Sequence, residues 1–190
     1  MGYFGCENMS ALNPNMGFIQ ILNGFQKWEQ NVSHLLMQNK DLFKLLFYDD
    51  FDPLSHDITD EQIADMMTEY TEINERNPNC KVFFRKFTND VEMEQGSQIR
   101  IYPIRVRPSD IYIGDMQFRI DAITHMGIDK IKNENRRHRM ASEILQSLNG
   151  QEIKMVKDVR IVEMYMWENQ YIRQFDGWSL IFATGVSAIG

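Results

Sequence analysis

Apolar side chains in the first part of the chain recur at helical spacing. A helix is expected to begin near Met16, because the following apolar positions share one face. These positions are Phe18, Ile21, Leu22, Phe25, Trp28, Val32, Leu35 and Leu36. A second helical stretch, Leu42 to Tyr48, is almost entirely apolar, so it must be covered on most of its sides.

An acidic turn, Asp49 to Asp52, follows this second helix. Pro53 biases Asp52 away from helical geometry, so the apolar run ends at a fixed bend. Thr59 with Gln62 has the spacing of a capping box and predicts the start of a third helix. Its apolar stripe is expected to comprise Ile63, Met66, Met67 and Tyr70.

Alternation with a period of two begins after residue 80 and predicts strands. The expected strands span residues 81–87, 98–106, 116–122, 159–166 and 179–184. Pro103 is expected to interrupt the second strand, and the polar, acidic segment 88–97 suits the tip of a hairpin. The last two strands are expected to form an antiparallel pair.

Residues 129–149 predict a long helix that ends at Gly150. The order of elements indicates an α+β fold, a mostly antiparallel sheet packed on this long helix, with an N-terminal helical segment. We expect a flexible arm over residues 1–15 and a single domain over 16–190. Within that domain, 16–75 would be the helical part and 81–186 the sheet with its helix.

Composition narrows the function classes. The net charge of -7 argues against general binding of nucleic acid, which depends on many Lys and Arg contacts to phosphate. Cys6 and Cys80 have no CxxC spacing and predict neither a zinc site nor a disulfide framework. No run approaches the roughly 18 apolar residues of a membrane span, so no membrane association is expected.

Candidate chemistry is sparse. His34, His56, His125 and His138 lie in different expected elements without metal-ligand spacing. The acidic turn could be a cation site, but it lacks the glycine and distal glutamate of an EF-hand, and turn formation explains it better. We therefore expect no catalytic residues, no metal ligands and no cofactor.

The strongest charge feature is a basic cluster in the expected helix over 129–149. It consists of Lys130, Lys132, Arg136, Arg137 and Arg139. One interpretation is a solvated helix face balanced by Asp129 and Glu134. The other is a subunit interface that meets an acidic loop of a neighbouring copy, with Asp90, Glu92 and Glu94.

Four segments of the chain carry a resemblance to a known family. They are KLLFYDDFDPL (44–54), FRIDAITH (118–125), EILQSLNG (143–150) and FDGWSLIFAT (175–184). In these segments the chain resembles the tail-terminator and head-tail joining (neck) proteins of tailed bacteriophages, and together they span roughly residues 40–186. The resemblance implies a virion structural protein and not an enzyme.

What the resemblance implies is a tail-terminator subunit that caps the tail tube and joins it to the neck. Such subunits form a homo-oligomeric ring, commonly hexameric, that contacts the tail-tube protein and other neck proteins. Genomic DNA would only pass through the channel. The protein would be assembled in the host cytoplasm and located in the virion.

Three alternatives remain open at this point. Another neck component, a head-closure or adaptor protein, belongs to the same class. A soluble cellular enzyme or regulator would need an unrecognised site, since no nucleophile elbow, phosphate loop or HExxH occurs. A DNA-binding protein would use the basic segment 130–139, and the acidic net charge opposes it.

Overall fold

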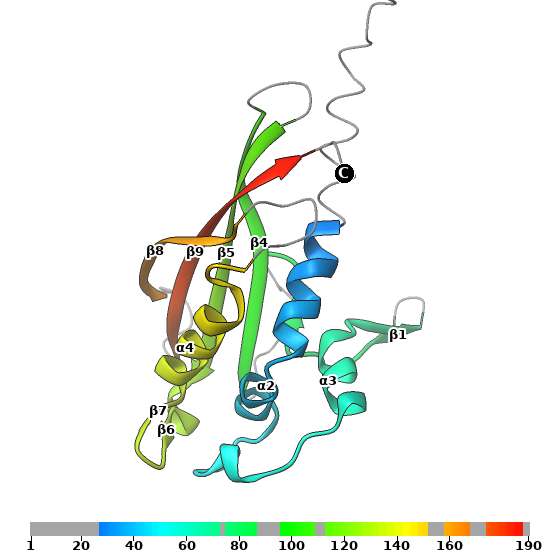
Figure 1. Ribbon diagram of the computed structural model, residues 1–190. Helices are drawn as coiled ribbons and strands as arrows, with labels where there is room; N and C mark the ends of the chain where they lie inside the picture. Colours follow the sequence, from blue (N-terminus) through cyan, green and yellow to red (C-terminus); the bar gives the residue numbers. More distant parts are fainter. Residues whose placement is uncertain are drawn as a thin grey trace, which may run out of the picture.

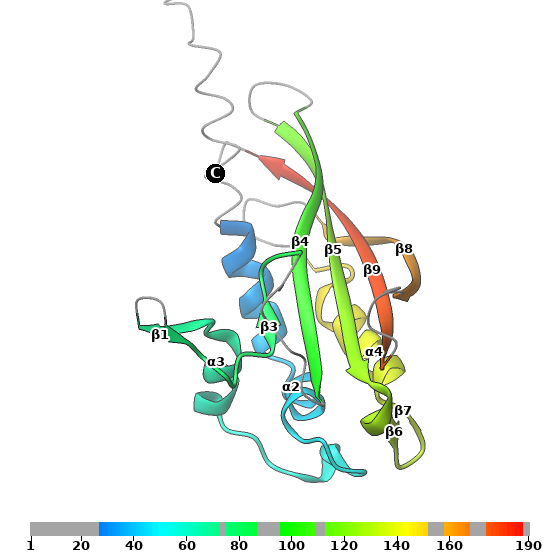
Figure 2. The same ribbon diagram turned by 180° about the vertical axis from the view of Figure 1, so that it is seen from behind.

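The computed structural model has a mixed α+β fold in which helices cover one face of a mostly antiparallel sheet (Figures 1 and 2). It describes residues 27–72, 75–86, 96–108, 113–151, 158–167 and 174–187. The expected N-terminal arm, residues 1–15, lies outside the described residues, as does the start of the first helix.

The main sheet has the order β3-β4-β5-β9-β8. Its strands are β3 (Val82–Phe83), β4 (Ser97–Pro108), β5 (Ile113–His125), β8 (Arg160–Trp167) and β9 (Phe175–Ser187). β4, β5, β9 and β8 pair antiparallel, whereas β3 pairs parallel with β4. The fold class predicted from the sequence is therefore confirmed.

Three helices pack on one face of this sheet, and Figure 2 shows the other face. They are a helix described over residues 27–37, α2 (Lys40–Phe47) and α4 (Arg136–Leu148). Short elements connect them to the sheet. These are η1 (Pro53–Ser55), α3 (Asp60–Met67), β1 (Tyr70–Glu72), β2 (Glu75–Arg76), η2 (Met126–Ile128), β6 (Lys130–Ile131) and β7 (Glu134–Asn135).

The core lies between the helices and the sheet. Trp28 of the first helix meets Phe118 of β5 edge-to-face with ring centroids 4.9 Å apart, and Phe118 stacks on Phe182 of β9 at 5.3 Å. Each fully buried side chain of this size contributes about 1.5–3 kcal/mol through removal of apolar surface from water. The helical face predicted from the sequence is confirmed where the structure describes it, since Trp28, Val32 and Leu36 are buried.

The capping box predicted at the start of α3 is present. The Gln62 amide donates to Thr59 Oγ1 at 3.3 Å, and the Thr59 amide donates to Gln62 Oε1 at 2.9 Å. Tyr70, however, does not belong to this helix as expected. The α3 helix ends at Met67, and Tyr70 is the first residue of β1. Its side chain is 50% exposed.

Two expectations for β3 and β4 are wrong. The strands lie parallel, so β3 and β4 do not form the expected hairpin with each other. β4 also continues through Pro103 to Pro108, with a register irregularity between Pro103 and Arg105. Proline is tolerated there because β3 pairs only with Ile99 and Arg100. At Pro103 the side of β4 that faces away from β5 therefore has no described partner strand.

The long helix predicted over residues 129–149 is shorter in the structure. Residues 130–135 form the antiparallel hairpin β6–β7 instead, and α4 begins at Arg136. Asn133 and Asn135 favour turns over helix interiors, which explains the later start. The expected end is correct, since Gly150 follows the helix with a φ of 79°.

None of the described helices is long and apolar enough to cross a membrane. The described residues also contain no group of three or more His, Cys, Asp or Glu side chains arranged to hold a metal ion.

Candidate functional site

The basic cluster is not one exposed strip on a single helix, contrary to the expectation from the sequence. Lys130 and Lys132 lie on the β6–β7 hairpin, and only Arg136, Arg137 and Arg139 lie on α4. Arg136 is fully buried, so the expectation that the face of Arg136 and Arg137 is exposed is wrong.

Arg136 is buried because its guanidinium caps the C-terminal end of α2. Nη1 donates to the carbonyl oxygen of Leu45 at 2.7 Å and also to that of Tyr48. Nη2 donates to Asp50 O at 2.8 Å, and Nε donates to Ile128 O at 3.0 Å. Helix ends leave carbonyls without partners and carry partial negative charge, so a buried cation is well placed there.

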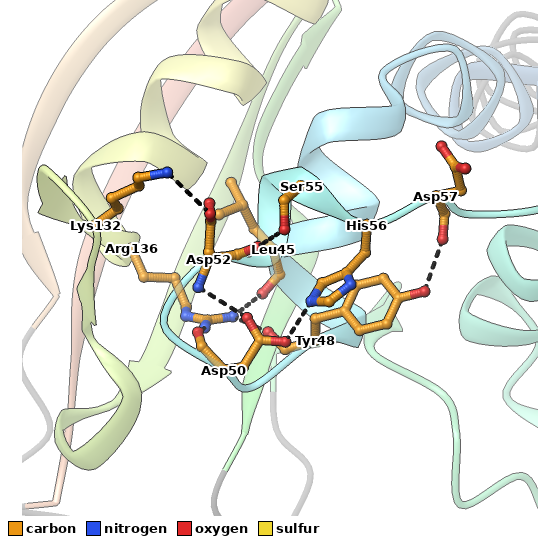
Figure 3. Close-up of polar contacts among 9 residues, drawn as sticks. All are labelled: Leu45, Tyr48, Asp50, Asp52, Ser55, His56, Asp57, Lys132 and Arg136. Carbon is orange, nitrogen blue, oxygen red and sulfur yellow. Dashed lines mark hydrogen bonds and ion pairs between the residues drawn. The ribbon is translucent and has the colours of Figure 1, made fainter.

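The same contacts bring the acidic turn against the start of α4 (Figure 3). Burial lowers the pKa of the Arg136 guanidinium, while the nearby carboxylates of Asp49, Asp50 and Asp129 act in the opposite direction. Partial burial raises the pKa of Asp49, against the attraction of Lys81 and Arg136. The turn therefore has a fixed cation beneath it.

Further contacts hold the turn from its outer side. The Asp52 amide donates to Asp50 Oδ1 at 2.9 Å, and His56 Nε2 lies 2.6 Å from Asp50 Oδ2. The Tyr48 hydroxyl donates to Asp57 O at 2.7 Å (Figure 3). These contacts agree with the interpretation of the acidic residues as turn formers.

The β6–β7 hairpin closes the other side of the turn. Lys132 Nζ lies 3.1 Å from Asp52 Oδ2, and the Lys132 amide donates to the carbonyl of Phe51 at 3.0 Å. Between turn and hairpin lies a hollow of about 160 Å³. Its lining residues are Phe51, Asp52, Pro53, Leu54, Ile131, Lys132, Asn133 and Glu134.

Two phenylalanines near the end of α2 face solvent, and one of them, Phe51, lines the hollow. Phe51 is 57% exposed and Phe47 is 39% exposed, although the backbone around them is held by the contacts of Arg136 and Lys132. The acidic residues of this turn were recognisable from the sequence, whereas the exposure of its two aromatic residues was not predicted. A signal was present in the sequence, since Phe47 and Phe51 flank Asp49 and Asp50 at the end of an apolar helix.

The other two arginines of the cluster pair within the chain. Arg137 forms ion pairs with Asp176 at the start of β9 and with Asp129, the latter at 3.6 Å. Arg139 Nε lies 2.6 Å from the buried carboxylate of Glu143. Arg137 therefore links α4 to its neighbours, whereas Arg139 pairs with Glu143 within α4.

The acidic residues expected to face the cluster, Asp90, Glu92 and Glu94, lie outside the described residues. The interface between this cluster and an acidic loop of a neighbouring copy stays a prediction. Among its basic members, Lys130 and Lys132 are the exposed ones.

A second candidate surface is the edge strand β8. Val162, Met164 and Met166 are 56%, 48% and 46% exposed, which is unusual for three large apolar side chains within one strand. In both ribbon views β8 lies at the outer edge of the sheet, and no described strand pairs with its free side. The strand was predicted from the sequence, but the exposure of its apolar side chains was not.

The sheet face opposite the helices carries a buried polar network. Asp121 Oδ2 accepts a hydrogen bond from the Tyr102 hydroxyl at 2.9 Å, and its Oδ1 accepts from Ser179 Oγ at 2.7 Å and Arg119 Nε at 2.5 Å. The Arg119 guanidinium also lies over the ring of Tyr165, 5.0 Å from its centroid. The network links all four antiparallel strands.

The described part of the chain is therefore a mixed α+β fold with two candidate binding surfaces. One is the turn after α2, with its exposed aromatic and acidic side chains, and the other is the apolar edge strand β8. A family model described as YomW matches residues 39–184, and the chain belongs to this family. The family is phage-derived, from the SPbeta region, so the protein is phage-associated. No curated protein matches the chain.

Proposed function

We propose that the protein is a virion structural protein of a tailed phage, a subunit of the tail-terminator ring that caps the tail tube and joins it to the neck. Membership of a phage-derived family supports a role in the phage. The resemblance of four segments to neck proteins supports the location. In this proposal the ring contacts the tail-tube protein and other neck proteins, and DNA passes through its channel.

The observation that carries the proposal is the apolar edge of β8. An edge strand that exposes Val162, Met164 and Met166 is a pairing and aggregation hazard in a monomer. Such an edge is explained if a neighbouring subunit covers it in an assembly. Methionine side chains adapt to the surface that covers them, which suits a contact formed during assembly.

The proposal is structural and not catalytic. The rival, a soluble enzyme or regulator, would have to act through a site that the sequence motifs do not indicate. Within the structural class, the runner-up is a head-closure or adaptor protein, which would occupy a different level of the neck.

The test combines purified protein and phage particles. Native mass spectrometry should show multiples of the 22.5 kDa chain, either for the protein alone or after addition of tail-tube protein. Electron microscopy of particles with a labelled chain should place the label at the junction of tail tube and neck. Label at the head portal would favour the head-closure alternative. A strict monomer that is absent from virions would refute the proposal.

A matched pair of variants tests the role of β8. Met164→Glu combined with Met166→Glu should abolish association with an unchanged circular dichroism spectrum, because both side chains are exposed in the subunit. Met126→Glu is the control, since Met126 is 58% exposed and belongs to η2 and not to β8. If the double variant associates as well as the control, β8 is not the contact.

A further inference from the structure

The acidic turn has exposed side chains on a backbone that is fixed by hydrogen bonds. We define the tip as residues 47–57, which include the exposed Phe47 and Phe51. Its carbonyls at Tyr48 and Asp50 are bound by the buried Arg136, and that at Phe51 by the Lys132 amide. Exposed aromatic side chains on a fixed backbone lose little conformational freedom on binding, which favours a docking role.

The tip also has the shape and the charge for a specific occupant. The hollow of about 160 Å³ is lined in part by apolar residues, which are Phe51, Pro53, Leu54 and Ile131. The charged residues that line it are Asp52, Glu134 and Lys132. The exposed Asp49, Asp50 and Asp57 lie on the same tip outside the hollow, so the surface around the hollow is acidic overall. A suitable occupant therefore offers one aliphatic side chain flanked by cations.

The protein itself carries such a segment at the end of the molecule opposite the tip. We define the arm as residues 103–108 of β4, in which Ile104 is 43% exposed and Arg105 and Arg107 are also exposed. The paired strands β4 and β5 project at one end of the molecule, and the turn after α2 lies at the opposite end (Figures 1 and 2). One subunit therefore cannot bring its own arm to its own tip.

We propose that the tip of one copy binds the arm of a second copy, with Ile104 against the apolar hollow and Arg105 and Arg107 near Asp49 and Asp57. Different patches meet in this contact, so it is heterologous and adds copies head to tail. The inference rests on the proposed function in one respect, that copies associate, and it uses a surface other than β8.

The test is a charge exchange between two variants. The arm variant is Arg105→Glu with Arg107→Glu, and the tip variant is Asp49→Lys with Asp57→Lys. Asp50 is left intact because its carboxylate contacts the Asp52 amide and His56. At Asp57 the backbone carbonyl, and not the carboxylate, accepts the hydrogen bond from Tyr48.

Each variant alone should associate at least about tenfold more weakly than the wild type in sedimentation velocity, because like charges meet. An equimolar mixture should regain association, since each reversed surface then finds an opposite one. Raising the salt concentration should weaken the wild-type contact, because exposed charges are screened. Glu72→Lys with Glu75→Lys on the β1–β2 hairpin is the control with the same charge change, and it should associate as strongly as the wild type, because its arm and its tip are both intact.

Several outcomes would overturn the inference. A mixture no better than its components excludes the direct pairing of tip and arm. A tip variant that associates normally as purified protein and is missing from virions identifies a different protein as the occupant. A wild-type monomer excludes the contact outright, while the presence of the chain at the neck of virions would separately uphold the proposed function.

Discussion

Arg136, the first residue of α4, donates a hydrogen bond of 2.7 Å to the carbonyl oxygen of Leu45 in the last turn of α2. The start of one helix therefore closes the end of another that lies far away in sequence. Because the same guanidinium also reaches Tyr48 and Asp50, the geometry of the acidic turn depends on α4.

Arg136→Met should therefore destabilise the subunit strongly. The change leaves several buried carbonyls without a donor, and we expect a loss of about 3–5 kcal/mol in the free energy of unfolding. Chemical denaturation followed by circular dichroism measures it. Lys132→Met is the matched control, because Lys132 is 64% exposed in its pair with Asp52 and should cost less than about 1 kcal/mol. Equal losses in the two variants would contradict this account.

The part of the fold that local patterns determine was predictable from the sequence. The alternation in β5, the apolar α2 and the capping box of Thr59 and Gln62 each depend on residues close in sequence, and each prediction is confirmed. The parallel pairing of β3 with β4 depends on a crossover, which no local pattern encodes.

The candidate site was less predictable for a similar reason. The basic cluster was recognised, but charge spacing on an expected helix does not reveal that Arg136 points to the end of α2. The burial of Arg136 follows from contacts over some ninety residues of sequence, as with Leu45 at a separation of 91. The β6–β7 hairpin moves Lys130 and Lys132 off the helix, and the local signal for it was Asn133 and Asn135, which favour turns over helix interiors.

Gly177 of β9 tests how closely the central strands approach. A Cβ at this position would lie 2.1 Å from the carbonyl oxygen of Ala122 on β5. Because the obstructing atom belongs to a paired strand, Gly177→Ala should cost about 3 kcal/mol. Thermal and chemical unfolding measure the loss.

Gly150 provides the comparison for that variant. A Cβ there meets nothing within 4 Å, but φ is +79°, so Gly150→Ala should cost about 1–2 kcal/mol through backbone conformation alone. Gly150→Asn should recover part of this loss, since asparagine tolerates the left-handed region. A Gly177→Ala variant as stable as the wild type would show that β5 and β9 can separate.

Cys80 should be unreactive in the folded protein. Its side chain is buried, and desolvation raises the pKa of the thiol to about 11. Since the thiolate is the nucleophile, alkylation of Cys80 by iodoacetamide at pH 8 should be at least about tenfold slower than in denaturant. Peptide mass spectrometry distinguishes Cys80 from Cys6. Equal rates for Cys80 in the two conditions would contradict the prediction.

Tyr102 should make the free energy of unfolding fall as the pH becomes alkaline. Burial, together with the Asp121 carboxylate that accepts its hydrogen bond, raises the pKa of the Tyr102 hydroxyl above its ordinary value. A group whose pKa is raised by folding stabilises the protein below the unfolded pKa, near 10 for tyrosine, and this contribution is lost as the pH rises. The wild type should therefore lose stability above about pH 10.

Tyr102→Phe isolates this contribution. At pH 8 the variant should be less stable by about 2 kcal/mol, because Asp121 loses one hydrogen bond while Arg119 and Ser179 remain. As the pH rises past about 10, the difference between the two proteins should shrink by up to about 1.4 kcal/mol per unit, since only the wild type has this hydroxyl. The comparison cancels the contribution of Cys80, which both proteins contain. Urea denaturation at a series of pH values measures the difference, and a constant difference between pH 8 and 11 would mean that Tyr102 titrates alike in the folded and unfolded chain.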